Sequence, residues 1–361
     1  MPPLFYHLPE NEYYSIMFAM KDIWNYLESA RKPIVLYGMG NGADAVISAC
    51  EKYGIKISGV FASDGFVRAK TFHSMPVTDY ETAEKVFGDM IVLLCFGTSL
   101  PPVIENIKRI AKENELYAPD VPVCGDALFC REYYERRKAE FDEVYSRLCD
   151  DASRKTFSNI VSYKLSGDIN YLFACETDKE EPYGDFLELT DEETYLDLGA
   201  YRGDTVLSFA GRVKSYKKII AVEPDRKSYE KLCANTRKLE NTENINAFVG
   251  EKCGVTGFVM NGSRGAGTAN AGKPVRVISV DSLNIAPSFI KMDIEGFEAA
   301  AIAGGRKTIS EYRPKMQIAA YHRSGDLTDI PKAVFACRDD YKLYLRHNPC
   351  LPAWDVNYFF V

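Results

Sequence analysis

The sequence predicts an α/β protein made of two doubly wound, Rossmann-like units that are joined by a helical bridge. Short apolar runs alternate with amphipathic segments between residues 33 and 113, and the same alternation returns between residues 194 and 360. Strands that alternate with helices in this way predict parallel sheets. The stretch between the two alternations is charged, has helical spacing and ends in turn residues. We therefore divide the chain into an N-terminal unit (1–125), a bridge (126–190) and a C-terminal unit (191–361).

The composition is that of a globular protein, and it argues against a nucleic-acid or membrane partner. Of 361 residues, 46% are hydrophobic and 26% are charged, which allows a core in each unit. The net charge of −7 opposes binding to a phosphate backbone. Apolar runs are shorter than a bilayer span and no secretory signal is visible, so we expect a cytoplasmic protein. Several of the ten cysteines lie in apolar runs and none forms a CxxC pair, which predicts buried thiols rather than a zinc site.

The N-terminal unit carries a glycine turn between its first strand and the helix that follows. Gly38-Met-Gly-Asn-Gly42 comes after the strand at 33–37 and opens a helix that ends near Tyr53. Such a turn brings backbone amides to a phosphate, and Asp64 after the next strand would meet a ribose. Glycines also occur at this place only to bring strand and helix together. Two roles stay open for this unit: nucleotide or nucleotide-sugar binding, or a scaffold that orients the other unit or forms a homodimer.

The other elements follow from the hydrophobic period of each segment. An amphipathic helix is predicted over 10–31. The N-terminal unit has further strands at 57–61 and 90–96 and helices at 82–87 and 102–113. The C-terminal unit has strands at 194–198, 218–222, 245–250, 275–280, 289–294, 315–321, 341–345 and 356–360, and helices at 204–213, 226–239 and 297–309. A glycine-rich stretch at 261–272 is predicted to be a mobile lid.

Two motifs of the C-terminal unit support each other as a nucleoside site. Asp197-Leu-Gly-Ala-Tyr-Arg-Gly-Asp-Thr205 follows its first strand, and Val222-Glu-Pro-Asp225 ends its second strand. The turn lets a ligand approach the backbone, and the Glu223 carboxylate can accept hydrogen bonds from both ribose hydroxyls. A dinucleotide site needs GxGxxG, whereas this turn is Gly-x-x-x-Gly between Asp197 and Asp204. These carboxylates would repel a pyrophosphate and suit the ammonium and sulfonium of S-adenosylmethionine.

A third motif places two carboxylates and a lysine at the end of a later strand. Lys291, Asp293 and Glu295 alternate, so a strand sends them to one side, toward the ligand crevice at the carboxyl edge of the sheet. The two acids can hold a substrate hydroxyl, accept its proton or bind a divalent ion; a salt-bridged strand end without a catalytic part is the alternative. His322 follows the next strand and is a second candidate base. Glu251 is a candidate adenine ligand.

Residues 190–361 resemble the FkbM family of S-adenosylmethionine-dependent methyltransferases. The similarity rests on the two nucleoside-site motifs and above all on Ile290-Lys-Met-Asp-Ile-Glu-Gly-Phe-Glu298, and it extends to Ala320-Tyr-His-Arg and Leu343-Tyr-Leu-Arg-His. The resemblance implies a class I methyltransferase fold and O-methylation of a hydroxyl on a sugar or a polyketide-derived natural product.

We therefore expect an O-methyltransferase with S-adenosylmethionine as cofactor, a small-molecule acceptor such as a sugar or nucleotide-sugar, and a metal requirement that stays open. The expected cofactor contacts are Asp197, Gly199, Ala200, Tyr201, Gly203, Thr205, Glu223, Pro224, Asp225 and Glu251, and the expected catalytic residues are Asp293, Glu295 and His322. The alternatives are an NAD-dependent oxidoreductase that uses Gly38–Ala43, although no catalytic set is evident near residue 98, and a nucleotide-sensing or scaffold protein.

Overall fold

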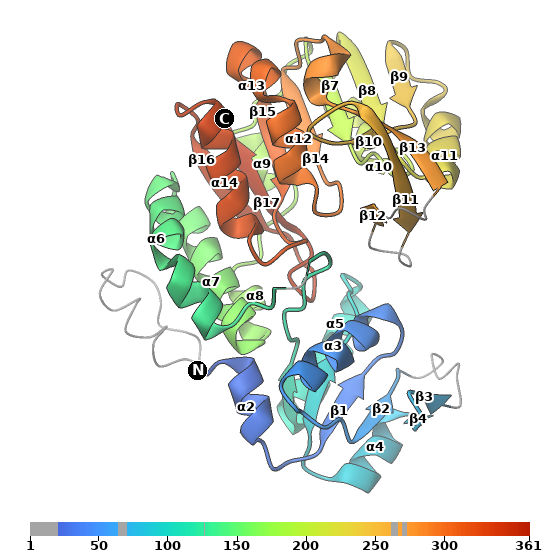
Figure 1. Ribbon diagram of the computed structural model, residues 1–361, viewed down its shortest axis with the longest axis vertical. Coiled ribbons are helices and arrows are strands. Elements are labelled where there is room, and N and C mark those ends of the chain that lie inside the picture. The colour runs from blue at the N-terminus through green and yellow to red at the C-terminus, as the bar shows by residue number, and fades with distance from the viewer. Residues whose placement is uncertain (1–20, 64–70, 126, 261–265, 269–272) are drawn as a thin grey trace.

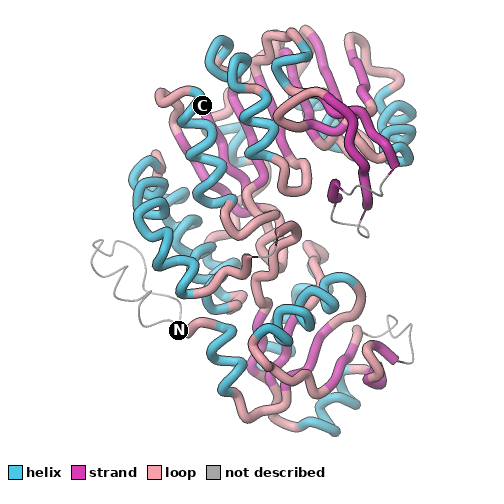
Figure 2. The backbone as a smooth tube through the Cα atoms, in the orientation of Figure 1, coloured by secondary structure: helices cyan, strands magenta, loops and turns pink. Residues whose placement is uncertain are grey.

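The computed structural model describes residues 21–63, 71–125, 127–260, 266–268 and 273–361. Two α/β units lie at opposite ends of the molecule, and the bridge helices run beside them (Figure 1). Each unit has its own strands, which Figure 2 separates from the helices by colour. The predicted fold class, two parallel-dominated α/β units joined by helices, is confirmed. The expected ribose ligand Asp64, the first half of the helix over 10–31 and most of the loop 261–272 lie outside the described residues.

The N-terminal unit is built on a six-stranded sheet in the order β3-β4-β2-β1-β5-β6. The strands are β1 (Ile34–Tyr37), β2 (Gly59–Phe61), β3 (Thr71–Phe72), β4 (Met75–Thr78), β5 (Ile91–Leu94) and β6 (Glu115–Tyr117). Neighbours pair in parallel except β3 and β4, which are antiparallel. The predicted strands became β1, β2 and β5. Strands β3, β4 and β6 were not predicted, because polar residues or proline interrupt their apolar sequence.

Helices cover both faces of this sheet. These are α2 (Ile23–Ser29), α3 (Asn41–Lys52), α4 (Tyr80–Phe87) and α5 (Pro101–Glu113). Side chains of α2 and α3 share a core with Ile34 and Leu36 of β1, whereas α4 and α5 share one with Val35 and Tyr37. Successive side chains of a strand point to opposite faces, so two helices lie on each side. This sandwich makes β1 and β5 fully buried, which explains their continuous apolar sequence.

The bridge is part of the core and not a flexible linker. It contains α6 (Arg131–Arg147), α7 (Asp151–Ser166), α8 (Asn170–Ala174) and α9 (Glu181–Asp185). Helix α7 packs on strand β16 (Leu343–His347), and Asp150 at its N-cap pairs with the buried Arg346 guanidinium at 2.7 Å. One apolar cluster runs from the N-terminal sheet through α6 and α7 into the C-terminal sheet. The two units are therefore held in a fixed relation by shared packing.

The C-terminal unit is built on a seven-stranded sheet in the order β16-β17-β15-β14-β7-β8-β9. Its other strands are β7 (Thr194–Leu198), β8 (Lys218–Val222), β9 (Thr242–Ile245), β14 (Phe289–Met292), β15 (Lys315–Ala319) and β17 (Val356–Phe360). The strands from β9 to β15 are parallel, and β17 is antiparallel to both of its neighbours. The strand order reverses at β7, between β8 and β14. Doubly wound sheets bind ligands at the carboxyl edge of such a point.

The remaining elements of this unit differ from the predictions in several places, and α14 was not predicted. Its helices are α10 (Asp204–Arg212), α11 (Arg226–Thr236), α12 (Glu298–Gly304), α13 (Arg306–Tyr312) and α14 (Asp326–Cys337). The single helix predicted over 297–309 is divided at Gly304–Gly305, where Gly304 packs against backbone of Gly250 and Glu251. A small second sheet, in the order β10-β13-β11-β12, contains β10 (Phe248–Val249), β11 (Gly254–Met260), β12 (Ala266–Thr268) and β13 (Lys273–Ile278).

Backbone hydrogen bonds join the two units around one point. Thr98, after β5, exchanges two hydrogen bonds with Leu351, at 2.7 and 2.9 Å. The amide of Cys124 donates to the carbonyl of His322 at 3.0 Å, and the Ser324 hydroxyl donates to the carbonyl of Ala127. The N-terminal unit is thus anchored next to the loops that end β14 and β15. Among the described residues, no helix combines the length and apolar character that crossing a membrane requires.

Candidate active site

A cleft of about 1590 Å³ opens at the carboxyl ends of β7, β8 and β14 and reaches the N-terminal unit. The C-terminal wall includes Tyr201, Glu223 and Asp293, one from each of the three motifs. The opposite wall includes Gly42 of the N-terminal glycine turn and Phe96 after β5. The three motifs of the C-terminal unit therefore meet at one cavity, and both glycine turns of the chain border it.

The turn after β7 is tight because it lies directly on the end of β14. Gly199 has φ of +83°, and a Cβ there would stand 1.9 Å from the carbonyl oxygen of Asp293. Gly203 also has positive φ and packs on Leu232 and Thr236 of α11. Tyr201 adopts φ of +47° and remains exposed at the cleft. Both glycines are therefore required by packing of the turn, which in turn presents Tyr201 and the start of α10 to the cleft.

Glu223 ends β8 and is held by the backbone on both sides. Its Oε2 accepts from the amide of Tyr201 and its Oε1 from the amide of Asp225, both at 2.8 Å. Burial raises the pKa of Glu223 to about 7, against the lowering effect of these two amides. Each oxygen keeps a further lone pair. A fixed acceptor with two free lone pairs fits the two vicinal hydroxyls of a ribose.

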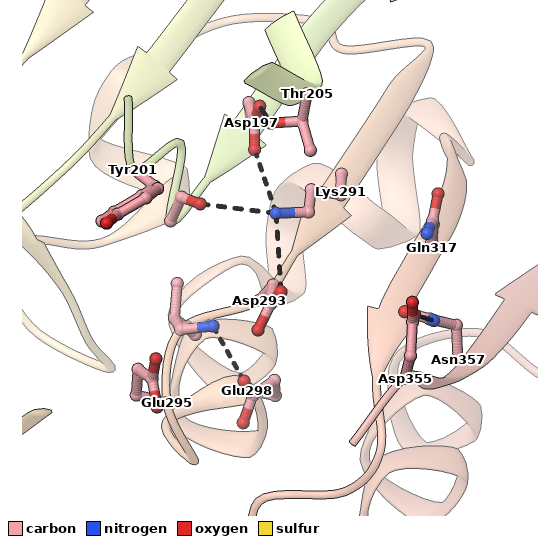
Figure 3. A network of polar contacts seen from close by, with 12 residues as sticks. Asp197, Tyr201, Thr205, Lys291, Asp293, Glu295, Glu298, Gln317, Asp355 and Asn357 are labelled. Atoms are coloured by element: carbon pink, nitrogen blue, oxygen red, sulfur yellow. Dashed lines mark hydrogen bonds and ion pairs between the residues drawn. The ribbon is translucent and has the colours of Figure 1, made fainter. Parts of the chain in front are cut away.

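Asp197 lies behind the cleft wall, in contact with Lys291 (Figure 3). It is fully buried, accepts from the Thr205 hydroxyl, and has Oδ1 3.6 Å from the Lys291 Nζ. Nζ also donates to the carbonyl of Gly199 at 3.3 Å and lies 3.9 Å from Asp293. Burial raises the pKa of Asp197, and the nearby ammonium opposes this rise. Asp197 therefore holds Thr205 and Lys291 in place from behind the cleft wall.

The loop after β14 is shaped by Glu298, the first residue of α12. Its Oε1 accepts from the amides of Ile294 at 2.9 Å and Gly296 at 3.4 Å. These bonds hold a sharp turn in which Glu295 has φ of +57° and Gly296 +88°. The turn leaves the side chains of Asp293 and Glu295 partly exposed at the cleft.

His322 lies at the centre of the carboxylates of this loop. Its Nδ1 is 3.1 Å from Glu298, and its Nε2 is 3.4 Å from Asp293 and 3.8 Å from Glu295. Burial lowers the pKa of His322, but these three acids outweigh it and raise the pKa to about 9. The three acids therefore favour the positively charged form of the His322 ring in the ligand-free protein.

The structure brings most of the predicted residues to the cleft. Those on its wall are Gly199, Tyr201, Thr205, Glu223, Pro224, Asp293, Glu295 and His322. Asp197, Ala200 and Gly203 are buried beneath the turn, and Asp225 caps α11 through the Ser228 amide. Glu251 is exposed beyond β10, and Phe248 and Val249 of that strand line the cleft instead.

Sequence reasoning missed the parts played by Glu298 and Lys291. Glu298 was part of the third motif, but an acid in the first turn of a helix ordinarily indicates no more than a favourable helix dipole. The sequence signal for the burial of Glu298 was its neighbourhood, because the four residues that follow it are apolar. Lys291 stands inside an apolar strand, where a charge requires a buried partner.

The far end of the cleft carries planar polar side chains and an aromatic ring. Asp355 Oδ1 accepts from the side-chain amides of Asn348 at 3.0 Å and Asn357 at 2.8 Å, and its Oδ2 lies 3.1 Å from Lys179. Trp354 lines the same end. Sequence analysis gave no sign of this group, because it forms on the loop between β16 and β17 only when the chain folds.

Comparison with known proteins finds similarity to one family in the C-terminal unit and to one solved structure along nearly the whole chain. Residues 197–341 match the methyltransferase FkbM domain. Among curated proteins, none is similar enough in sequence to count as a relative. The solved structure of methyltransferase FkbM from Methylobacillus flagellatus KT is 21% identical and has a TM-score of 0.71, over 98% of this chain and 94% of that one.

Two further solved structures match about half of this chain. Precorrin-6y C5,15-methyltransferase from Geobacter metallireducens GS-15 is 14% identical over 48% of this chain and 81% of its own, with a TM-score of 0.32. Fibrillarin from Aeropyrum pernix is 12% identical over 48% of this chain and 67% of its own, with a TM-score of 0.33. Residues 197–341 thus match the methyltransferase FkbM domain, and nearly the whole chain, N-terminal unit and bridge included, shares the fold of the solved FkbM methyltransferase.

Proposed function

We propose that this protein is an S-adenosylmethionine-dependent O-methyltransferase that acts on a hydroxyl of a sugar or of a sugar-like natural product. The observation that carries the proposal is a single cleft with two ends. Glu223 and the glycine turn border one end, Asp293 and His322 lie at the middle, and the polar group around Asp355 borders the other. A methyl donor and an acceptor can therefore meet at Asp293.

The donor end suits each part of S-adenosylmethionine. The Glu223 carboxylate, fixed by two backbone amides, is the proposed ribose acceptor. Phe248 and Val249 offer an apolar wall to the adenine, and the buried ammonium of Lys291 offers a counter-charge to the methionine carboxylate. A mostly apolar wall with a few fixed polar groups is typical of a cofactor site.

The acceptor end suits a compact molecule with several hydroxyl groups. Asn348, Asn357 and Asp355 are already connected to one another, so their remaining donors and acceptors are held in place. Trp354 beside them provides an apolar face on which a sugar ring can stack. This pairing of fixed amides with an aromatic face supports a sugar-like acceptor.

Asp293 is the proposed proton acceptor. When bound, S-adenosylmethionine supplies a methyl group that passes in line from sulfur to the acceptor oxygen. A sugar hydroxyl is too weak an acid to ionise beforehand at neutral pH, so its proton leaves as the new bond forms. Asp293 can take this proton because its side chain is 36% exposed on the cleft, whereas His322 behind it is 1% exposed. The chain's larger contribution is to position both partners.

Calorimetry with S-adenosylhomocysteine tests the donor half of the proposal. We expect a low-micromolar dissociation constant, about −8 kcal/mol, for the full chain. The acceptor half is tested by transfer of labelled methyl from S-adenosylmethionine to a panel of sugars, nucleotide-sugars and polyhydroxylated natural products, with products identified by mass. Binding of NAD in place of S-adenosylhomocysteine would overturn the proposal.

Asp293→Asn should lower the rate of methyl transfer by about a hundredfold or more and leave S-adenosylhomocysteine affinity close to wild type. The reason is that the amide keeps the shape of the side chain but accepts a proton poorly. Single-turnover kinetics with the acceptor found in the panel measures the effect. Glu251→Gln is the matched control, because this acid is exposed outside the cleft. A full rate in Asp293→Asn would remove Asp293 as the base.

A further inference from the structure

We propose that Asp293, Glu298 and His322 bind a divalent metal ion at the middle of the cleft. The three residues each offer a ligand atom, and these atoms all lie within 4.8 Å of one another. Asp293 directly follows β14 and Glu298 begins α12, and the fold brings His322, from the loop after β15, to these two acids. The ion's part in catalysis rests on the proposed function, whereas its binding does not.

The first argument is that the cluster contains buried polar atoms without partners. Both ring nitrogens of His322 and Oε2 of Glu298 have no hydrogen-bond partner in the described part of the chain. Both side chains are 1% exposed. Backbone amides fix Glu298 through Oε1, which is also the oxygen 3.1 Å from Nδ1 of His322, and leave Oε2 without a donor. A buried anionic oxygen without a donor costs free energy, and a bound cation removes that cost.

The second argument is the spacing of the ligand atoms. Nδ1 of His322 is 3.1 Å from Glu298, and Nε2 is 3.4 Å from Asp293. Adjacent ligands held about 2.1 Å from one ion lie roughly 3 Å apart. Although these contacts are short, neither is directed as a ring N–H donates. An imidazole binds an ion through one nitrogen and donates from the other to a carboxylate. In the proposed site the ion would lie at Nε2 beside Asp293, Nδ1 would face Oε1 of Glu298, and the unpartnered Oε2 of Glu298 would be the third ligand atom.

The kind of ion and its open side follow from the ligand types. Carboxylates with one imidazole suit Mn²⁺ or Zn²⁺ better than Mg²⁺ or Ca²⁺, which prefer oxygen alone. Protein groups surround the ion from the His322 side, and the cleft borders it at Asp293 and Glu295, which are 36% and 35% exposed. An acceptor hydroxyl that enters from the cleft would become a further ligand and give up its proton more readily, to the oxygen of Asp293 that the ion leaves free or to Glu295.

Titration of the full chain with Mn²⁺ tests the proposal directly. The protein is first stripped with EDTA, and free Mn²⁺ is followed by electron paramagnetic resonance, with and without S-adenosylhomocysteine. We expect one saturable site. Glu298→Gln and His322→Gln should each weaken it by about tenfold or more. Asp355→Asn is the matched control, because this carboxylate of the same cleft already has Asn348, Asn357 and Lys179 as partners.

A second readout needs no variant. The sequence contains four histidines, His7, His73, His322 and His347, so their ring signals can be resolved by nuclear magnetic resonance. Mn²⁺ should broaden the His322 signal at lower concentration than that of His347 on β16. A wild-type protein that binds S-adenosylhomocysteine but neither takes up Mn²⁺ nor broadens at His322 overturns the metal site and leaves the proposed function standing. A protein that takes up Mn²⁺ at His322 but does not bind S-adenosylhomocysteine would support the metal site and overturn the proposed function.

Discussion

The two glycine turns of this chain border one cleft from opposite units, but they differ in the residues that accompany them. In each turn a glycine lies against the neighbouring strand, since a Cβ would stand 2.1 Å from the Cys95 carbonyl at Gly42 and 1.9 Å from the Asp293 carbonyl at Gly199. Strand β8 beside the second turn ends in Glu223, whereas β2 beside the first ends in Phe61 and the buried Ala62. A glycine in such a turn therefore indicates close packing in both units, whereas the acid that follows the neighbouring strand indicates a ligand site in the C-terminal unit.

Substitution of the packed glycines should have the largest effect on stability. Gly199→Ala adds a methyl group against backbone at positive φ, which should cost roughly 3 kcal/mol or more of unfolding free energy. Gly40→Ala is the matched control, because φ is +96° and ψ −162° there but the space around it is open, so that only backbone strain of about 1–3 kcal/mol is expected. Urea denaturation measures both. Equal costs at the two positions would show that packing does not fix the second turn.

Glu223→Ala should lower the affinity for S-adenosylhomocysteine by about 1.5–3 kcal/mol, or roughly ten- to 150-fold. The variant removes the charged acceptor proposed for the ribose hydroxyls. Asp44→Ala makes the matching change at the first turn of α3, on the opposite wall of the cleft, and should leave the affinity unchanged. Calorimetry compares the two. An equal loss in both variants would mean that the two turns contribute alike to the donor site.

Periodic sequence features predicted the layers of the fold, and three short motifs predicted the location of the site. Apolar runs such as 91–94 and 289–292 became central strands because both faces of a parallel sheet are covered. Features that depend on tertiary contacts were not predictable. The contact of Asp197 with Lys291 joins two strands and was not expected, and the exposed position of Glu251 beyond β10 depends on how that short strand pairs.

Donor binding should depend on pH near neutrality, because burial raises the pKa of Glu223 to about 7. The carboxylate that should accept from the ribose is then half protonated near neutral pH, and affinity for S-adenosylhomocysteine should rise by about tenfold between pH 6 and pH 8 if only the ionised form binds. Asp225, Lys291 and the Tyr201 amide are the groups that act on it. Glu223→Gln should make the affinity independent of pH in this range, and a slope that persists in that variant would assign the titration to another group.

The raised pKa of Glu223 has the opposite effect on the free energy of unfolding of the ligand-free protein, which should fall as the pH rises. The folded pKa of Glu223 lies above its ordinary value of 4.5, so the folded state holds this proton to higher pH than the unfolded chain does. Its favourable contribution is complete below pH 4.5 and is lost as pH rises through about 7. Glu223→Gln should therefore be more stable than wild type at pH 8 and bind the donor less tightly. Thermal unfolding at pH 5 and pH 8 measures the difference.

The last prediction concerns the N-terminal glycine turn, where we expect no nucleotide to bind. The segment Gly38-Met-Gly-Asn-Gly-Ala-Asp44 contains no lysine or arginine to meet a diphosphate. Asp44 places a carboxylate in the first turn of α3, where a phosphate would have to approach. Gly38 and Gly42 are accounted for by contact with Phe96 and Cys95. These observations favour the role of this unit as a scaffold and cleft wall over a nucleotide site of its own.

Titration of the full chain with ADP, NAD and UDP-sugars should therefore give no saturable heat under conditions in which S-adenosylhomocysteine binds. Asp44→Asn separates the two reasons for this silence. If charge repulsion alone prevents binding, the neutral variant should take up ADP; if the packed glycines leave no accessible amides, it should remain silent. We expect silence in both proteins, because the Gly42 contact with strand β5 does not depend on Asp44. Binding by the wild type would place a second nucleotide site on the cleft and make a nucleotide-linked sugar the first acceptor to try.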